Sequence, residues 1–356
     1  MKKMNGYRAY YDTLSYTAEQ KMQIAQRAAK AADRAKQKKR GNHHALTKIT
    51  AAAACLISVV TITAEAAGIP TPVSEILAPI FGGSVAQTEV IDKIGYPVDA
   101  WDSDNGVTIT ADAIIGDAYN ACLVFTISRD DGTPLLPEGV TAEQLHLGGY
   151  SDVSLLKLGG SHGTARFIDA VPGDEKLQYV YFVSSDEPLN KGNAKATFGD
   201  LSCWDEETEQ SAAVLEGEWK LRFDVDYEDS SISLGGGETF AQGDMTFSIT
   251  DVCISPIAIR VSYEVDSEAQ WSDAPSGQLP EEDRRQLERY MENVEILLTK
   301  TDGTVIDLSG AGGSVKPGDG KTDCVKSTVF SEVIPLEEME SICVGGVKFA
   351  LSGENS

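Results

Sequence analysis

The sequence is poor in cysteine and histidine, the usual ligands of zinc. Its 356 residues include six cysteines and four histidines, and no two cysteines stand in Cys-x-x-Cys spacing. Zinc is therefore the least favoured interpretation of the cysteines. Beyond the first 48 residues the only histidines are His146 and His162, so a hydrolase triad there would need one of them. We predict no metal and no cofactor.

Positive charge is scarce after Lys48. Residues 1–48 contain 12 Lys and Arg against three acids, a net charge of +9, whereas residues 49–356 contain 18 against 52, a net charge of −34. At the boundary lie residues 49–64, sixteen consecutive residues without a charged side chain. A basic flank before an apolar helix and an acidic region after it is typical of a membrane protein whose basic end lies in the cytoplasm.

The apolar stretch predicts one membrane span. A helix of sixteen residues is about 24 Å long, against a hydrocarbon core of about 30 Å. We therefore extend the span to residues 46–67, with Lys48 and Glu65 near its ends. The alternative is a signal peptide cleaved near Ala64-Glu65-Ala66, but the long leader before it favours an uncleaved anchor. The sequence thus predicts a single-pass protein of the cell membrane, with a cytoplasmic N-terminus and extracytoplasmic C-terminal domains.

The predicted cytoplasmic segment, residues 1–45, is too short and too polar to bury a core of its own. A helix is expected over residues 17–40, with Thr17 and Gln20 in capping-box spacing. Its basic end would lie against anionic lipid head groups, and no nucleic-acid-binding motif frames it, so direct binding to nucleic acid is not expected. Bulky apolar side chains with nothing to cover them predict a partner-binding surface. The residues of this surface are Tyr7, Tyr10, Tyr11, Leu14, Tyr16 and Ile24.

The region after the span changes from a neck to strands. Residues 68–88 predict a semi-rigid juxtamembrane neck with one short helix over residues 73–77, because its prolines exclude a long helix. Beyond it, apolar and polar residues alternate with the period of a strand, as over residues 257–265. Turns of the hairpin type are predicted at Asp131-Gly132 and Asp302-Gly303.

Two halves of the strand-rich region resemble each other. Residues 106–114 match residues 244–252 at an offset of 138, and residues 153–158 match residues 294–299 at an offset of 141. We predict two tandem immunoglobulin-like β-sandwich domains. Their predicted bounds are residues 89–229 and 238–353, with a glycine linker at residues 235–237 and a helical insertion over residues 280–291. The whole chain is thus expected to be mainly β, with an N-terminal cytoplasmic helix and one transmembrane helix.

Five cysteines lie beyond the predicted span, an odd number. No disulfide is the favoured interpretation, and one or two bridges remain the alternative. Cys122 and Cys253 fall in apolar strands, where a free thiol acts as a small apolar side chain.

Two motifs resemble a catalytic site and a calcium site. Residues 159–163 match the Gly-x-Ser-x-Gly pattern around Ser161, but a nucleophile there needs a helix after it, whereas residues 164–171 predict a strand. Residues 102–106 resemble the start of a calcium loop, yet its last ligand would be Ala113, so we predict an Asx-rich hairpin turn. No enzymatic activity is expected.

The chain resembles a group of membrane-anchored proteins of Gram-positive bacteria that carry an extracytoplasmic domain of unknown function. The resemblance rests on the basic N-terminal helix, the alanine-rich span running into residues 64–70, the Ile-Phe-Gly-Gly of residues 80–83, and the Asn-Gly-Val-Thr-Ile-Thr of residues 105–110. Members of the group are commonly encoded beside extracytoplasmic-function sigma factors and are regarded as their anti-sigma factors. The His-x3-Cys-x2-Cys zinc signature of many anti-sigma domains is absent, because the cytoplasmic segment has His43 and His44 but no cysteine.

The sequence is consistent with two functions. The first is a regulator whose residues 1–45 hold a sigma factor and whose ectodomain senses an unidentified envelope signal. The second is a cell-surface adhesion or envelope-scaffold protein, in which the cytoplasmic segment only sets topology. Replacing residues 1–35 with an unrelated basic helix would abolish the first function and spare the second.

Overall fold

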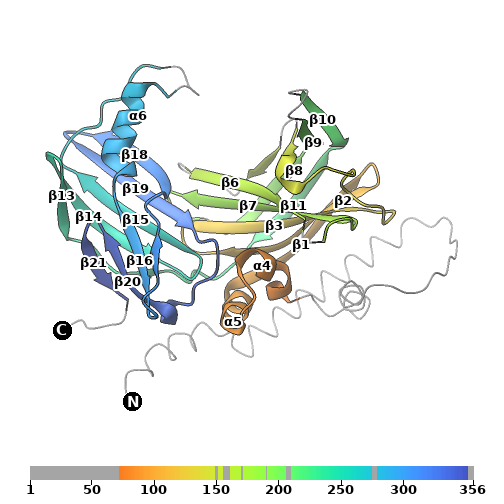
Figure 1. Ribbon diagram of the computed structural model, residues 1–356, viewed down its shortest axis with the longest axis horizontal. Helices are drawn as coiled ribbons and strands as arrows, with labels where there is room; N and C mark the ends of the chain where they lie inside the picture. Colours follow the sequence, from red (N-terminus) through yellow and green to blue (C-terminus); the bar gives the residue numbers. More distant parts are fainter. Residues whose placement is uncertain are drawn as a thin grey trace, which may run out of the picture. The chain divides into compact units, whose positions relative to one another are not determined.

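The structure is a computed structural model that describes residues 72–148, 151–154, 161–169, 171–189, 191–205, 210–274 and 279–351 (Figure 1). The predicted cytoplasmic segment and membrane span lie outside these residues. Within the described ranges, no helix combines the length and the apolar character needed to cross a membrane. Leu77–Ser356 forms one compact unit. Its fold is mainly β, with several antiparallel sheets, as the sequence predicts.

Two short helices precede the first strand. Helix α4 spans Val73–Phe81 and so continues beyond the predicted helix over residues 73–77. Helix α5 spans Val85–Ile94 and begins at a capping box, in which the Ser84 and Gln87 side chains each accept a hydrogen bond from the other residue's main-chain N–H.

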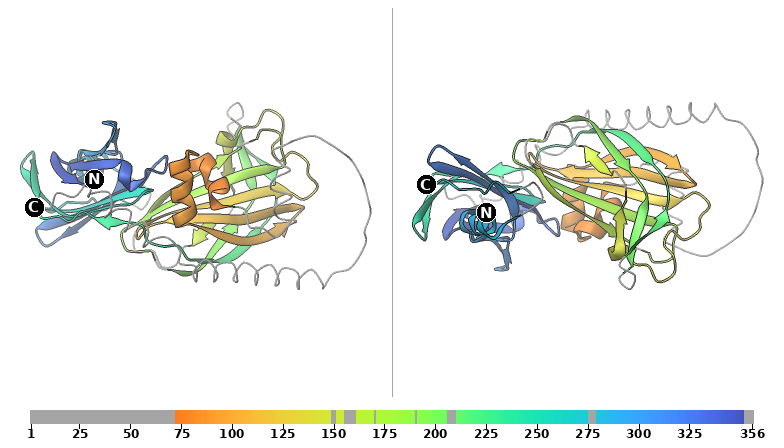
Figure 2. Two further views of the ribbon diagram at one scale, coloured as in Figure 1. Left: turned by 90° about the horizontal axis from the view of Figure 1, so that it is seen from below. Right: turned by 90° about the horizontal axis from the view of Figure 1, so that it is seen from above.

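Helix α5 changes the start of the β region. The first strand begins at Gly95, whereas the sequence analysis placed the start of the first domain at residue 89. Buried Val90, Ile91 and Ile94 of α5 face the strands that follow. Figure 2 shows the orange helical segment lying along strands β1 and β2, with which α5 is in contact.

Repeat 1, which we define as strands β1 to β11, is built around a five-stranded antiparallel sheet. In spatial order its strands are β1 (Gly95–Asp104), β2 (Val107–Gly116), β3 (Asn120–Arg129), β7 (Lys176–Ser185) and β6 (Ser161–Ile168). A 3₁₀ turn η1 (Ala142–Gln144) connects this sheet to the next strand. Strand β6 lies at the edge of the sheet, because its only described partner is β7.

Two three-stranded sheets complete repeat 1. One has the order β10 (Gln210–Leu215), β9 (Leu201–Asp205) and β4 (Leu145–Leu147); the other has the order β11 (Trp219–Val225), β8 (Gly192–Phe198) and β5 (Asp152–Ser154). Strand β11 alternates buried and exposed residues along its length, as the sequence pattern predicts. Its Phe223 packs on Phe125 of β3, with ring centroids 6.2 Å apart. The indole N–H of Trp219 donates to the Val107 carbonyl at 2.9 Å and joins β11 to β2.

Repeat 2, strands β12 to β21, contains one larger and one smaller antiparallel sheet. The larger has the order β12 (Ile232–Ser233), β14 (Met245–Ile254), β15 (Ala258–Val265), β19 (Lys321–Val329) and β18 (Gly312–Gly318), with β13 (Thr239–Gln242) also paired to β14. The smaller has the order β17 (Val305–Asp307), β16 (Ile296–Lys300), β20 (Met339–Val344) and β21 (Val347–Ala350). The remaining elements are α6 (Glu281–Leu287), the π-helical turn η2 (Glu288–Glu292) and the 3₁₀ turn η3 (Leu336–Glu338). The predicted helical insertion over residues 280–291 is therefore confirmed.

The larger sheets of the two repeats share their strand order. The order β1-β2-β3-β7-β6 corresponds to β12/β13-β14-β15-β19-β18, and no described sheet mixes strands of the two repeats. In each central hairpin one extra residue makes a bulge: Asp112 between β2 and β3, and Thr250 between β14 and β15. These residues are 138 positions apart, the offset found in the sequence. The shared bulge supports the predicted internal repeat.

Equivalent turns of the two repeats meet in a buried polar junction. The Asp117 N–H donates to the Asn120 carbonyl at 2.8 Å, and the Ser255 N–H donates to the Ala258 carbonyl at 2.9 Å. Asp117 and Ser255 are again 138 positions apart. The Ser255 hydroxyl donates to Oδ2 of Asp117 at 2.6 Å, and both residues are buried.

Asn120 extends this junction. Its Nδ2 donates to the Asp117 carboxylate, while its Oδ1 lies 2.7 Å from the Ser184 hydroxyl and 2.8 Å from the Ser327 hydroxyl. Burial raises the pKa of the Asp117 carboxyl, and the hydrogen bonds from Ser255, Tyr119 and Asn120 oppose that rise. The repeats are therefore joined by hydrogen bonds that water does not reach.

The end of α4 contacts both repeats. The ring of Phe81 packs edge-on against Phe182 of β7, with centroids 6.0 Å apart. Its carbonyl accepts a hydrogen bond from the Val333 N–H of repeat 2 at 2.8 Å. The Gln87 side chain of α5 donates to the Val333 carbonyl at 3.1 Å. This part of the predicted neck is thus packed against the β region.

The predicted turns have mixed outcomes. Asn105 and Gly106, with φ of 49° and 74°, close the β1–β2 hairpin, as predicted for the Asx-rich segment. Asp302-Gly303 closes the β16–β17 hairpin, also as predicted. The prediction of a hairpin at Asp131-Gly132 is wrong, because the turn there leads from β3 to β4, which belongs to a different sheet. A turn signal fixes a local reversal of the chain but not the partner of the next strand.

All five cysteines beyond the predicted span are free thiols in the structure. Cys122 and Cys253 are buried in strands, as expected for small apolar side chains. Cys324 of β19 is buried as well, and burial raises its pKa to about 12. Such thiols carry almost no thiolate at neutral pH and are poor nucleophiles.

Candidate functional site

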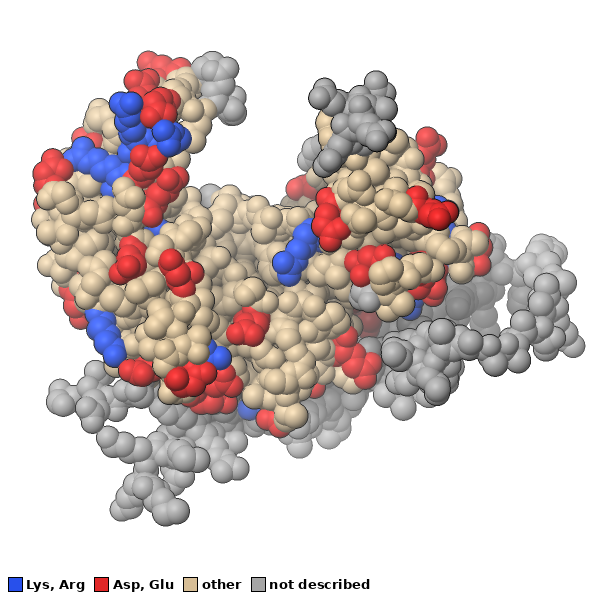
Figure 3. Space-filling view, in the orientation of Figure 1, with Lys and Arg blue, Asp and Glu red and all other residues tan. Residues whose placement is uncertain are grey.

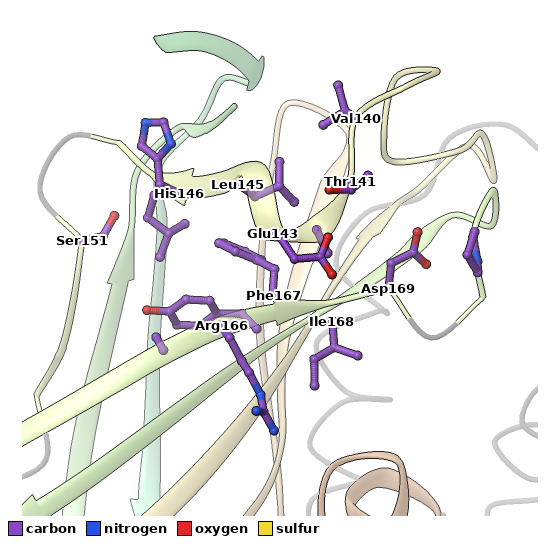
Figure 4. A pocket seen from close by; sticks show the side chains of 15 residues that line it. Val140, Thr141, Glu143, Leu145, His146, Ser151, Arg166, Phe167, Ile168 and Asp169 are labelled. Carbon is purple, nitrogen blue, oxygen red and sulfur yellow. The ribbon is translucent and has the colours of Figure 1, made fainter. Parts of the chain in front are cut away.

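An open pocket of about 1010 Å³ lies in repeat 1 between β6 and the η1–β4 segment (Figure 4). Its lining residues are Val140, Thr141, Ala142, Glu143, Leu145, His146, Leu147, Ser151, Ala165, Arg166, Phe167, Ile168, Asp169, Pro172 and Tyr179. They come from two segments that are distant in the sequence, residues 140–151 and 165–179. The volume is within the range of pockets that hold small ligands or a few residues of a peptide.

Two strand edges border this pocket. β6 ends the five-stranded sheet and β4 ends a three-stranded sheet, and in the described part of the chain neither has a second partner. Residues 163–166 of β6 are exposed. An edge strand directs every second pair of N–H and C=O groups away from its neighbour, where they remain free to bind another chain.

The floor of the pocket is apolar and aromatic. Phe167 of β6 and Leu145 of β4 are buried, and both belong to the core of repeat 1. The Phe167 ring packs against Tyr179 with centroids 5.0 Å apart, and Tyr179 in turn packs against Phe198 at 5.6 Å. Burial raises the pKa of Tyr179 to about 12, so its phenol stays protonated at neutral pH. The floor therefore offers contact area and one neutral hydroxyl.

The formal charges that border the opening are acidic. Glu143 on η1 and Asp169 just after β6 both line it (Figure 4). The single Lys or Arg among the lining residues is Arg166, whose guanidinium carbon lies 5.3 Å from the centroid of the Phe182 ring. Phe182 and Arg166 share the face of the sheet opposite to Phe167, because strand side chains alternate. The side chain of Arg166 therefore points away from the two acids at the opening.

Hydrogen bonding in the pocket is incomplete at Asp169. Its Oδ1 is buried, and no described residue donates a hydrogen bond to it. Glu143 is exposed, and a hydrogen bond with Thr141 lowers its pKa, so it is ionised at neutral pH. His146 is occupied, since its Nε2 lies 2.9 Å from the Ser211 hydroxyl. The arrangement can accept hydrogen bonds and positive charge.

The residues singled out from the sequence lie elsewhere. The predicted partner-binding residues Tyr7, Tyr10, Tyr11, Leu14, Tyr16 and Ile24 fall outside the described residues. Ser161 is the first residue of β6 and is exposed, and the strand that follows it replaces the helix that a nucleophile elbow requires. Its neighbour His162 has Nε2 3.2 Å from the Ser327 carbonyl in repeat 2. Among the described residues, no three His, Cys, Asp or Glu side chains gather as a metal site would need.

The aspartates of the calcium-like segment accept hydrogen bonds from the main chain. Oδ2 of Asp102 accepts a hydrogen bond from the Lys220 N–H at 2.8 Å, and Oδ2 of Asp104 accepts one from the Glu218 N–H at 2.9 Å. Both carboxylates thus fasten the β1–β2 hairpin to the start of β11.

No protein-family model matches the sequence, and no curated protein matches it either. Among solved structures, the chain is similar to the one described as "The crystal structure of the conserved domain protein from Bacillus anthracis". The two are 13% identical with a TM-score of 0.45, and the match covers 70% of this chain and 76% of that chain.

Sequence reasoning did not find the pocket. Alternation along each strand indicates which face Ala165 and Phe167 share, and likewise the face of Tyr179 on the next strand. It does not show which strand ends a sheet. The polar or small residues at positions 161–165 were the available signal, since a central strand would be apolar on at least one face.

Proposed function

We propose that the chain is a single-pass membrane regulator, an anti-sigma factor. Residues 1–45 hold a sigma factor at the membrane, residues 46–67 span it, and the β region binds an extracytoplasmic signal. The β region is proposed to act as two tandem immunoglobulin-like sandwiches, residues 89–229 and 238–353. The charge reversal at Lys48 supports the topology, and the resemblance to membrane-anchored anti-sigma factors supports the role of the cytoplasmic segment.

The observation that carries the sensing role is the pocket of repeat 1. Its apolar floor, the two strand edges that have no second partner among the described residues, and its acidic opening suit recognition of a ligand, and the described residues beside it form no cluster of metal ligands. On the face in Figure 3, acidic side chains lie in several patches along its lower edge and right side, and Lys and Arg are most numerous near α6, where acids stand among them. A nucleic acid is accordingly a poor partner for the β region.

Co-purification tests the proposal. Full-length protein is expressed with the sigma factor encoded nearest to it, and the control variant carries Tyr10→Ala, Tyr11→Ala and Leu14→Ala together. The proposal expects the sigma factor to co-purify with the wild type and to be lost from the triple variant, because these side chains have no core of their own to join. A full-length protein that captures no sigma factor would overturn it and favour the envelope-scaffold function.

A further inference from the structure

We infer that the pocket of repeat 1 binds an extended peptide segment with a basic side chain, which adds to the free edge of β6 as a further strand. The inference rests on the proposed sensing role of the β region and names the chemical class of its ligand. Three features of the site lead to it: an edge strand without lysine or proline, an apolar floor and an acidic opening.

β6 contains neither lysine nor proline, and its one charged side chain, Arg166, lies over Phe182 on the face opposite to the pocket floor. The equivalent edge strand of repeat 2, β18, contains Lys316 and Pro317, and Lys316 is ion-paired to Asp186 at 2.9 Å. Proline and lysine are common means of protecting an edge. β6 has neither residue in its sequence of Ser-His-Gly-Thr-Ala-Arg-Phe-Ile. The start of β6 lies against β18 at His162 and Gly312, whereas the part of β6 that borders the pocket has no second strand partner among the described residues.

The floor can accept alternate side chains of an added strand. A strand beside β6 would direct every second side chain toward the face that carries Ala165 and Phe167. Ala165 is exposed and small, so it leaves space above the strand next to the aromatic pair Phe167 and Tyr179. An apolar side chain of the peptide would bury its surface there, while main-chain hydrogen bonds to β6 would give affinity that is independent of sequence.

The opening selects for positive charge. Glu143 and Asp169 border it, and the guanidinium of Arg166 lies over Phe182 on the opposite face of the sheet. A Lys or Arg of the peptide would form charge-assisted hydrogen bonds with the carboxylates at the opening. An acidic peptide would meet repulsion from both carboxylates and from the overall negative charge of the chain.

The test uses full-length protein in a mild detergent and a fluorescein-labelled heptapeptide of alternating valine and lysine. Fluorescence polarisation is expected to show saturable binding that weakens as salt is added. A peptide with glutamate in place of lysine, and a lysine peptide N-methylated at alternate residues, are both expected to bind at least tenfold more weakly. The N-methylated peptide keeps its side chains but cannot complete the ladder of hydrogen bonds with β6.

Two matched variants locate the site. Ala165→Trp fills the pocket floor, whereas Thr164→Trp adds the same side chain to the other face of the same strand. Ala165→Trp and the double variant Glu143→Gln/Asp169→Asn should each weaken binding at least tenfold, and Thr164→Trp should bind like the wild type. Equal binding of the N-methylated peptide, or equal effects of the two tryptophan variants, would overturn the inference. Capture of the sigma factor by the same preparation tests the proposed function separately, so failure of one is distinguishable from failure of the other.

Discussion

The hydroxyl of Ser255 donates a 2.6 Å hydrogen bond to the carboxylate of Asp117, and the two residues hold the same position in the two repeats. Each begins a tight turn between two strands, and each side chain accepts hydrogen bonds from main-chain N–H groups of its own turn. The two copies of the turn have diverged so that one provides a donor and the other an acceptor. This pairing explains how two acidic repeats can share a buried contact.

We expect removal of the Ser255 hydroxyl from the junction to lower the stability of the protein strongly. Ser255→Ala leaves the buried Asp117 carboxylate without one of its donors, and we expect a loss of about 2 kcal/mol in the free energy of unfolding. Ser231→Ala is the control, because its hydroxyl donates to Asp229 at 2.6 Å in a solvent-exposed turn, where the loss should stay under about 1 kcal/mol. Denaturant unfolding compares the two variants. Equal losses would show that the junction contributes no more than a surface turn.

We expect the stability of the protein to depend on the ionisation of Asp112, the bulged residue of β2. Burial raises the pKa of Asp112 to about 7, although a hydrogen bond with Thr126 opposes the rise. The folded state therefore holds this proton more tightly than the unfolded state does. The stability that the carboxyl contributes is fully present below about pH 4 and is lost as the pH rises to about 7.

Asp112→Asn removes this dependence. The variant should be more stable than the wild type by on the order of 2 kcal/mol at pH 8. The difference should shrink toward zero near pH 4, where the wild-type carboxyl is protonated. Thermal unfolding of both proteins across this range measures it. A difference that stays constant with pH would contradict the assigned burial of the carboxyl.

We expect substitution of Lys326, in repeat 2, to lower the stability of the protein strongly. Its ammonium is buried and donates to the carbonyls of Met291, Val294 and Ser309 at 2.9, 2.9 and 2.6 Å. Lys326→Met leaves three carbonyls without this donor, so we expect a loss of about 3 kcal/mol or more. Lys321→Met on the same strand is the control, because its ion pair with Glu264 is exposed and contributes under about 1 kcal/mol.

The lowered pKa of Lys326 also predicts how the stability of the protein changes at alkaline pH. Burial lowers the pKa of Lys326 to about 8, whereas an unfolded lysine keeps its proton to about pH 10. Between these values the unfolded state binds more protons, so the stability of the wild type should rise relative to Lys326→Met as the pH increases. Denaturant midpoints at pH 7.5 and 9.5 test the trend. A wild type that loses stability relative to the variant over this interval would contradict it.

Local patterns in the sequence predicted the strands and the repeat, but not the contacts between distant segments. The alternation in residues 257–265 predicts β15, and the offset of 138 predicts equivalent hairpins, because both depend on nearest neighbours along the chain. The hydrogen bond between Asp117 and Ser255 depends on how the repeats pack. Helix α5 was missed although Ser84 and Gln87 have capping-box spacing, since the prolines before it dominated the interpretation of the neck.

One part of the candidate pocket follows from local sequence, and another part depends on contacts between distant segments. Strand β6 follows from its own residues, yet its position at the edge of a sheet is set by the pairing of β7 with β3. The acidic opening likewise depends on η1 lying beside β6. The cytoplasmic partner surface was predicted from side chains that lack a core, and it stays a prediction.

The central claim is that the cytoplasmic segment restrains a sigma factor, and a transcriptional reporter tests it most directly. Residues 1–35 are replaced in the chromosome by an unrelated basic helix, with the span and β region unchanged and the protein level checked by immunoblot. The account predicts that transcription from promoters of the neighbouring sigma factor rises to the level seen when the whole gene is deleted. Transcription that stays at the wild-type level, while the deletion raises it, would contradict the role assigned to this segment.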